Sequence, residues 1–143
     1  MPQPLVSKAH TIWNGSLTDG SGKVSLDSSG LATFDISWKA RSEAHNGTTT
    51  PEELIAAAHS ACFSMALSNG LAQNDTPPQE LHTSADVAFV AGEGITGITL
   101  NLLATVEGLD EAKFQEIAAD AKTNCPVSQA LAGVDITLKA RLA

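Results

Sequence analysis

The stretch that decides the fold reads TPEELIAAAHSACFSMALSN and covers residues 50–69. It predicts a helix, because Thr50 can cap the first turn, Pro51 suits the first helical position, and Glu53 follows the cap by three residues. Gly70 comes directly after this run and is expected to end the helix. A long helix therefore occupies the middle of the chain.

The side chains of this helix are small or apolar on nearly every face. A stripe of apolar residues repeats every four positions, at Leu54, Ala58, Cys62 and Ala66. The opposite face carries alanine and serine rather than charged residues. Helices of this kind are usually covered on several sides. We therefore expect the helix at the centre of the molecule or at an interface between subunits.

The segments around this helix predict strands and shorter helices. Strands are expected at residues 6–13, 23–27, 31–38, 84–90, 95–107 and 134–142, and helices at 111–122 and 126–131. The first three strands are separated by short turns and should form an antiparallel meander. The residues from 39 to 49 are expected to form a loop. The order of elements indicates an α+β protein with one domain over residues 1–143.

The composition restricts the partners of the protein. Sixteen acidic against eight basic side chains give a net charge of −8, which repels nucleic acid and anionic lipid. The first ten residues do not resemble a secretory signal. The apolar run from Leu54 to Leu67 is too short to span a bilayer. We therefore expect a cytoplasmic protein that binds neither nucleic acid nor membrane.

The two cysteines are the candidate reactive groups. Cys62 lies on the apolar stripe, where an inert packing role is the ordinary interpretation. Cys125 precedes Pro126 at the start of a predicted helix, a position that favours a thiolate. The two lie 63 positions apart without a C-x-x-C pair, so a structural zinc site is not expected. The residues leave open whether they are buried thiols or one redox pair.

Two motifs resemble those of the OsmC/Ohr family, the osmotically inducible and organic hydroperoxide resistance proteins. PEELIAAAHSACFSMAL, residues 51–67, is similar to the signature helix of that family. NCPVS, residues 124–128, resembles its second cysteine motif. The FSMAL continuation resembles the OsmC branch more than the Ohr branch. The resemblance extends over essentially the whole chain.

This resemblance implies a fold, an activity and a set of site residues. The fold would have antiparallel strands around a central buried helix in an intertwined homodimer. The activity would be a two-cysteine peroxidase that reduces organic hydroperoxides to alcohols without metal or cofactor. Cys62 corresponds to the peroxidatic cysteine, Cys125 to the resolving cysteine, Glu52 to the catalytic glutamate and Arg41 to the catalytic arginine. The reductant would be a dithiol such as a dihydrolipoyl protein.

The spacing of Glu52 and Cys62 gives an independent indication of a shared site. Ten residues of helix span about 15 Å, too far for both side chains to reach one peroxide directly. Two such helices packed antiparallel across a two-fold axis would bring Glu52 of one chain towards Cys62 of the other. The spacing therefore predicts an active site composed of two subunits.

Three alternatives remain at this point. Lys39 could supply the cation instead of Arg41. The protein could be a non-catalytic binding protein for a small hydrophobic ligand, with both thiols merely buried. His59 could act as a base for Cys62 in acyl transfer, although on a helix it is expected to pack or to bond locally. The four histidines show no metal-ligand spacing.

Overall fold

In a computed structural model, which describes residues 2–143, the chain folds into two compact units. One unit reaches Pro51 and the other spans Glu52–Ala143. Helices and strands are combined in both units, which confirms the α+β class. The expected single domain over residues 1–143 stays a prediction.

The first unit is the predicted meander, followed by a short helix. Strands β1 (Ala9–Asn14), β2 (Ser21–Leu26) and β3 (Thr33–Ile36) pair antiparallel in that order. Helix α1 (Trp38–Ser42) occupies part of the predicted loop and is therefore a correction. It forms because the Ser37 hydroxyl accepts a hydrogen bond from the Ala40 backbone N–H and caps the first turn.

The second unit contains a three-stranded sheet in the order β4-β5-β6. Strands β4 (Glu80–Val90) and β5 (Gly94–Thr105) form the predicted hairpin, which turns at two glycines of positive φ, Gly92 and Gly94. The last strand, β6 (Ile136–Leu142), pairs with β5 in parallel. The expectation of purely antiparallel strands is wrong here, because the connection through two helices returns the chain in the direction of β5.

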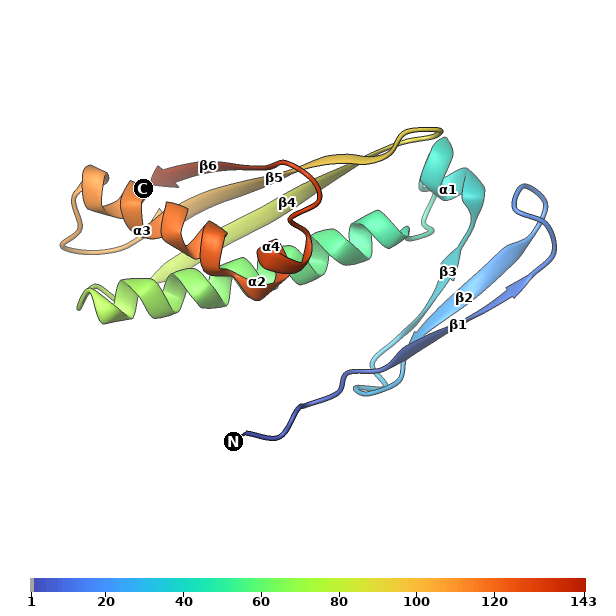
Figure 1. The fold of residues 1–143 in the computed structure, drawn as a ribbon, viewed down its shortest axis with the longest axis horizontal. Coiled ribbons are helices and arrows are strands. Elements are labelled where there is room, and N and C mark those ends of the chain that lie inside the picture. The colour runs from blue at the N-terminus through green and yellow to red at the C-terminus, as the bar shows by residue number, and fades with distance from the viewer. Residues whose placement is uncertain (1) are drawn as a thin grey trace. The chain divides into compact units, whose positions relative to one another are not determined.

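Three helices complete this unit: α2 (Pro51–Gln73), α3 (Glu111–Asn124) and α4 (Pro126–Ala130). Figure 1 shows α2 running beside the sheet, with α3 and α4 on the same side. The buried core joins side chains of α2, β5 and α3: Phe63, Leu67, Leu71, Leu100, Leu102, Ala104, Phe114, Ile117, Ala118, Ala121 and Cys125. One face of the sheet is thus covered by helices, and the site residues of α2 and α4 lie at this layer.

The buried row of α2 differs by one position from the predicted stripe. His59, Phe63, Leu67 and Leu71 are buried, whereas Cys62 and Ala66 are half-buried and Ala58 is exposed. The sequence pattern is nearly uniform around the helix, so packing against the core, rather than the pattern, selects the buried row. Met65 keeps 73% of its surface exposed, so the core of the second unit buries α2 along one row.

Helix α2 also continues past its predicted end. Gly70 lies inside the helix, which ends at Gln73. A Cβ at this position would lie 3.2 Å from the Ile117 side chain. Glycine here permits α2 and α3 to approach closely, and it does not act as a stop.

With 23 residues and a mean hydropathy of 1.3, α2 is long and apolar enough to cross a bilayer by length and composition alone. The apolar helix is therefore longer than the predicted run from Leu54 to Leu67. The core helix of a soluble domain meets the same criterion, and α2 contributes a buried row to the core of its own unit. The helix is weak evidence for a membrane protein.

Candidate active site

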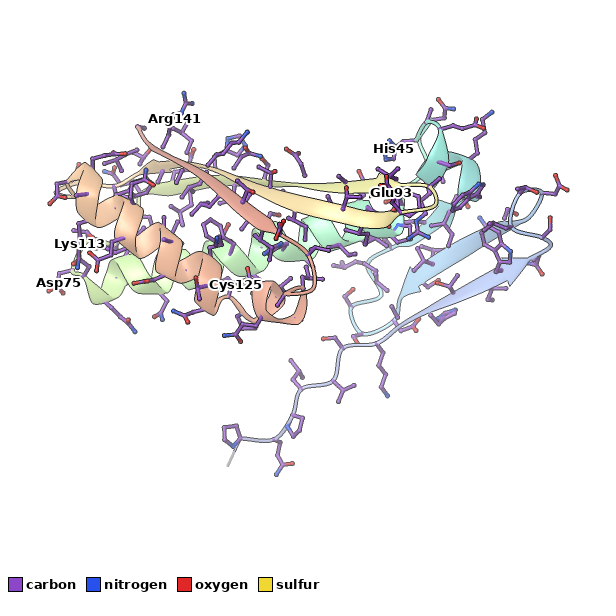
Figure 2. All side chains as sticks on the ribbon, turned by 45° about the horizontal axis from the view of Figure 1, so that its top comes forward. His45, Asp75, Glu93, Lys113, Cys125 and Arg141 are labelled. Atoms are coloured by element: carbon purple, nitrogen blue, oxygen red, sulfur yellow. The ribbon has the colours of Figure 1, made fainter. Side chains whose placement is uncertain are left out.

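The fold brings the two cysteines together. Cys62 lies in the middle of α2, and Cys125 lies between α3 and α4 (Figure 2), as predicted at the start of a helix that begins with Pro126. Their thiols are free, and the Cys125 and Cys62 Sγ atoms are hydrogen-bonded to each other at 3.0 Å. A disulfide needs sulfur atoms about 2.05 Å apart, so only a small movement separates this pair from a covalent bond.

Access differs between the two thiols. Cys125 has no exposed surface, whereas Cys62 is half-buried and lines a groove of about 640 Å³. The other walls of the groove come from α2, α3 and the start of α4, and combine apolar side chains such as Met65 and Ile117 with the polar Asn69 and Asp120. A small molecule in the groove can therefore reach Cys62, and Cys125 is covered behind it.

Ionisation differs in the opposite sense. Burial raises the pKa of the Cys62 thiol, and its hydrogen bond with Cys125 raises it further. Burial also raises the pKa of Cys125, but hydrogen bonds from Cys62, Ser128 and Val127 outweigh it, and the pKa of Cys125 is lowered. Within one chain the pair therefore ionises at Cys125 first, and Cys62 needs a further positive charge to become the nucleophile.

His59 is fully buried, and its partner lies far away in sequence. Its Nε2 lies 2.7 Å from the Ser128 Oγ, across 69 residues of chain. Burial lowers the pKa of this imidazole, so it is neutral near neutral pH. His59 points to α4 rather than to Cys62, which counts against a Cys62–His59 base pair for acyl transfer.

Ser128 is a site residue that was not predicted, although it belongs to the NCPVS motif. It lies three residues after Cys125, and this helical spacing places the two side chains on one face. That spacing is the signal that could have identified Ser128 from the sequence. The serine is 95% buried, with a relative exposure of 5%.

The two remaining predicted site residues belong to different units. Glu52 lies in the first turn of α2 and is buried, with a relative exposure of 5%. It lies ten residues before Cys62 on the same continuous helix, which corresponds to about 15 Å. Arg41 lies in α1, in the first unit. The structure therefore joins Cys62 to Cys125 in one site, and the parts of Arg41 and Glu52 stay predictions.

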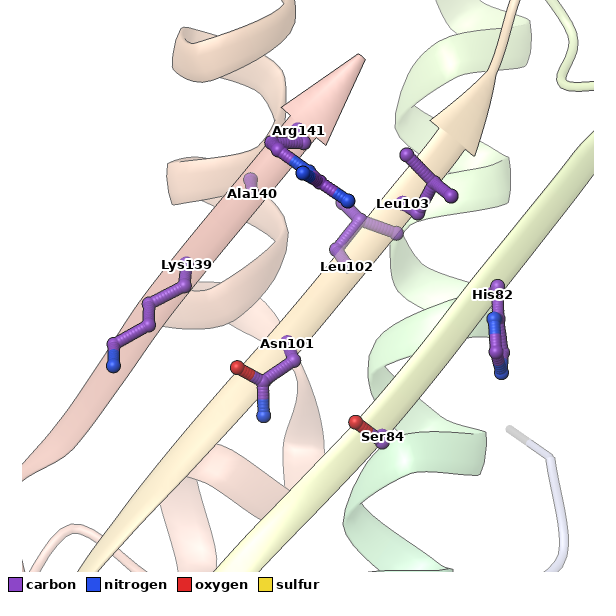
Figure 3. A pocket seen from close by; sticks show the side chains of 8 residues that line it. All are labelled: His82, Ser84, Asn101, Leu102, Leu103, Lys139, Ala140 and Arg141. Carbon is purple, nitrogen blue, oxygen red and sulfur yellow. The ribbon is translucent and has the colours of Figure 1, made fainter. Parts of the chain in front are cut away.

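A second hollow, of about 470 Å³, lies on the opposite face of the β4-β5-β6 sheet. Figure 3 shows its lining side chains: His82, Ser84, Asn101, Leu102, Leu103, Lys139, Ala140 and Arg141. This lining contains no cysteine and none of the predicted site residues. Within residues 2–143, no group of three or more His, Cys, Asp or Glu side chains could hold a metal ion.

The arrangement matches a known family. The family model described as OsmC-like protein matches residues 44–139, which include the signature helix and both cysteines. The chain belongs to the OsmC-like family. The resemblance seen in the two sequence motifs is thereby confirmed.

Named relatives of the OsmC-like chain fall in both branches. The chain is 42% identical over 138 residues to peroxiredoxin OsmC of Escherichia coli strain K12, covering 94% of this chain and 95% of the relative. It is 33% identical over 122 residues to the organic hydroperoxide resistance protein OhrB of Bacillus subtilis strain 168, covering 83% and 88% of the two chains. The higher identity to OsmC agrees with the predicted branch.

A solved structure gives the same fold. The crystal structure of OhrB from Bacillus subtilis superposes with a TM-score of 0.65 at 28% identity, over 94% of this chain and 98% of that one. The shared fold extends over nearly the whole chain. The OsmC-like fold is therefore shown by both sequence and structure.

Proposed function

We propose that the protein is a thiol-dependent peroxidase that reduces organic hydroperoxides to alcohols. One observation carries the proposal: two thiols 63 residues apart in sequence meet at 3.0 Å, one beside a groove and one behind it. The names of its relatives, a peroxiredoxin and organic hydroperoxide resistance proteins, support the same reaction class.

In the first step, the Cys62 thiolate attacks the outer oxygen of a hydroperoxide ROOH. The O–O bond breaks, the sulfur gains that oxygen as a sulfenic acid, and the alkoxide takes a proton and leaves as ROH. In the second step, the Cys125 thiolate attacks the sulfenic sulfur. The S–O bond breaks, hydroxide leaves and becomes water, and a Cys62–Cys125 disulfide forms. An external dithiol then reduces the disulfide.

Arg41 is proposed as the cation that Cys62 needs. Its guanidinium would favour the Cys62 thiolate against the effect of burial, and would donate hydrogen bonds to the peroxide as charge moves onto the leaving oxygen. Glu52 would orient the guanidinium through a paired contact. A buried carboxylate requires such compensation, and Glu52 is nearly fully buried. Lys39, which lies in the same helix α1, is the alternative cation.

The active form is proposed to be an intertwined homodimer with sites shared between chains. Several large apolar side chains are exposed on one chain, including Ile12 at 61%, Leu31 at 82% and Met65 at 73%. A partner subunit would cover such surface. The 15 Å between Glu52 and Cys62 along α2 also favours a site to which two chains contribute.

The proposed partners follow from this chemistry. The oxidised protein would be reduced by a dithiol such as a dihydrolipoyl protein. After the first thiol forms a mixed disulfide with the protein, the second thiol attacks it, so that the reductant leaves as a disulfide and the protein is reduced. The acidic composition, with a net charge of −8, gives no support to nucleic-acid or membrane binding. We propose a cytoplasmic location and catalysis without metal or cofactor.

The test is one equivalent of tert-butyl hydroperoxide added to the reduced protein. The peroxidase proposal predicts the loss of both free thiols and an intramolecular Cys62–Cys125 disulfide by mass spectrometry of peptides. Retention of both thiols would instead favour the binding protein for a small hydrophobic ligand. Sulfenic acid appearing first on Cys125 would contradict the assigned roles.

A further inference from the structure

Behind the two cysteines, a chain of buried polar groups links α2 to α4. The His59 Nε2 lies 2.7 Å from the Ser128 Oγ. Ser128 follows the N-cap residue Cys125 by three positions in α4, and its hydroxyl and backbone N–H lower the pKa of the Cys125 thiol. Cys125 in turn lies 3.0 Å from Cys62. His59 and Cys125 have no exposed surface, and Ser128 has almost none. Such groups are costly to bury unless they serve one another.

The hydrogen-bonding partners determine the direction of donation along this chain. Among the residues that the structure describes, the His59 Nδ1 has no hydrogen-bond partner. A buried N–H without an acceptor is rarer and more costly than a bare ring nitrogen, so the proton belongs on Nε2. Nε2–H then donates to the Ser128 Oγ, and the Ser128 hydroxyl is left to donate its own proton to Cys125.

We propose that His59 and Ser128 are positioning residues that hold Cys125 as a thiolate, directed at the Cys62 sulfur, for the disulfide-forming step. The proposal rests on the peroxidase function proposed above and adds a structural basis for its second half. The first half of the reaction, attack by Cys62 on the hydroperoxide, does not require the contacts among His59, Ser128 and Cys125.

The chemistry of that step requires such support. The Cys125 thiolate supplies the electron pair of the new S–S bond, and the sulfenic oxygen of Cys62 leaves as hydroxide and takes up a proton to form water. A fully buried thiol without donors would stay protonated and react slowly. The Ser128 hydroxyl stabilises the thiolate, and the His59 N–H fixes the orientation of that hydroxyl.

The other groups around Cys125 leave this task to His59 and Ser128. The titratable groups of α2 nearest to it are Cys62 and His59 itself, and Asp120 of α3 lines the groove beside Cys62. The strands β5 and β6 contribute apolar side chains to the same core, such as Leu102 and Leu138. Asp120 would oppose a thiolate and cannot replace the donor chain.

The experiment separates the two steps in a single turnover. Wild type, Ser128→Ala, Ser128→Thr and His59→Phe are mixed with tert-butyl hydroperoxide, and the sulfenic acid and the disulfide are followed by quenching and mass spectrometry. Ser128→Ala and His59→Phe should form sulfenic acid on Cys62 no more slowly than the wild type, because a less ionised Cys125 no longer raises the pKa of Cys62. They should form the disulfide about tenfold or more slowly, the effect of losing a hydrogen bond to a charged group. Ser128→Thr keeps the hydroxyl and should restore the second rate.

A second readout does not depend on turnover. In the Cys62→Ser background, the ultraviolet absorbance of the Cys125 thiolate is measured against pH, with the Cys62→Ser/Cys125→Ser protein subtracted. Ser128→Ala should move its appearance to higher pH, and Ser128→Thr should move it back. If the wild type forms no disulfide with hydroperoxide, the peroxidase function fails. The titration still decides whether His59 and Ser128 stabilise the Cys125 thiolate.

The matched control is Ser64→Ala. Ser64 is also a partly buried hydroxyl of α2, but it bonds to the Ser60 carbonyl and Thr83 instead of the cysteines. It should leave both rates and the titration unchanged. The proposal is overturned if Ser128→Ala and His59→Phe form the disulfide at the wild-type rate, or if Ser64→Ala slows it equally. It is also overturned if neither Ser128→Ala nor His59→Phe folds by circular dichroism, because His59 and Ser128 would then be needed to stabilise the fold.

Discussion

The surroundings of Cys62 and Cys125 differ in two respects that oppose each other. Cys62 is accessible from the groove, but burial and the contact with Cys125 raise its pKa. Cys125 is inaccessible, but hydrogen bonds from Cys62, Ser128 and Val127 lower its pKa. A thiol that meets a substrate first is thus the one less ready to ionise.

This difference suggests how one pair of thiols can divide a two-step reaction. Access selects Cys62 for the first step, provided that a cation from elsewhere ionises it. Ionisation selects Cys125 for the second step, when its target is the neighbouring sulfur and access from solvent is irrelevant. Each environment would be unsuitable for the other role.

The largest expected effect is that of Cys62→Ser, which should reduce hydroperoxide turnover to the background without enzyme. No other thiol is accessible from the groove, and the Cys125 thiolate is covered. Hydroperoxide consumption in the presence of a dithiol measures this. Residual turnover carried by Cys125 would show that burial does not protect it from substrate.

Cys125→Ser should permit one oxidation per chain and then stop turnover with dithiols that act only on a disulfide. The sulfenic acid on Cys62 would have no resolving thiol and should proceed to sulfinic acid with excess hydroperoxide. Intact-mass measurements distinguish the addition of one oxygen from two. Sustained hydroperoxide turnover in this variant would mean that an external thiol resolves the Cys62 sulfenic acid.

Arg41→Ala should lower the rate of Cys62 oxidation by about a hundredfold, the usual effect of removing one donor to a developing negative charge. Because burial already raises the pKa of Cys62, loss of the cation should also move Cys62 alkylation to higher pH. Arg41→Lys should keep the Cys62 thiolate but lower the rate of its oxidation, because an ammonium lacks the planar guanidinium that hydrogen-bonds the peroxide at two points. If Arg41→Ala changes neither quantity, the same pair of measurements on Lys39→Ala tests the alternative cation.

The smallest effect is a partial recovery in mixed dimers. Glu52→Ala and Cys62→Ser proteins should each be nearly inactive, and heterodimers should contain one intact site if Glu52 acts across the interface. Random exchange makes half of the dimers heterodimers, so about a quarter of wild-type activity is expected. Exchange is verified with a mass-tagged chain. No recovery after verified exchange would place Glu52 and Cys62 in the same chain's site.

The parts of the fold with strong local signals could be predicted from the sequence. The start of α2 at Pro51, the capping of α3 by Asp110, and the hairpin turn at Gly92 and Gly94 each rest on chemistry within a few residues. The parallel pairing of β6 has no local signal, because it depends on the return of a crossover over two helices. Gly70 has the local signal of a helix stop, but it lies inside α2, and the nearby Ile117 side chain of α3, 3.2 Å from where a Cβ would be, is visible only in the folded chain.

The site was predictable in its residue types and only partly in its electrostatics. Both cysteine motifs are visible in the sequence, and their meeting at 3.0 Å agrees with the predicted pair. The partner of His59 lies 69 residues away on α4, so no local pattern reveals it. The lowered pKa of Cys125 draws on Val127 and Ser128, which lie in the helix start predicted from the sequence, and on Cys62, which only folding brings near.

The separation of the two cysteines along the chain links the catalytic state to resistance against heat. A bond between Cys62 and Cys125 would close a loop of 63 residues, running from the middle of α2 through both long strands to the end of α3. Closing a loop of that length removes enough freedom from the unfolded chain to stabilise the fold by about 4 kcal/mol. The oxidised enzyme, waiting for its reductant, would then melt at a higher temperature than the reduced enzyme. Under peroxide stress the oxidised protein would thus resist heat better than the reduced protein. A melting curve would report which fraction of the molecules has been reduced again.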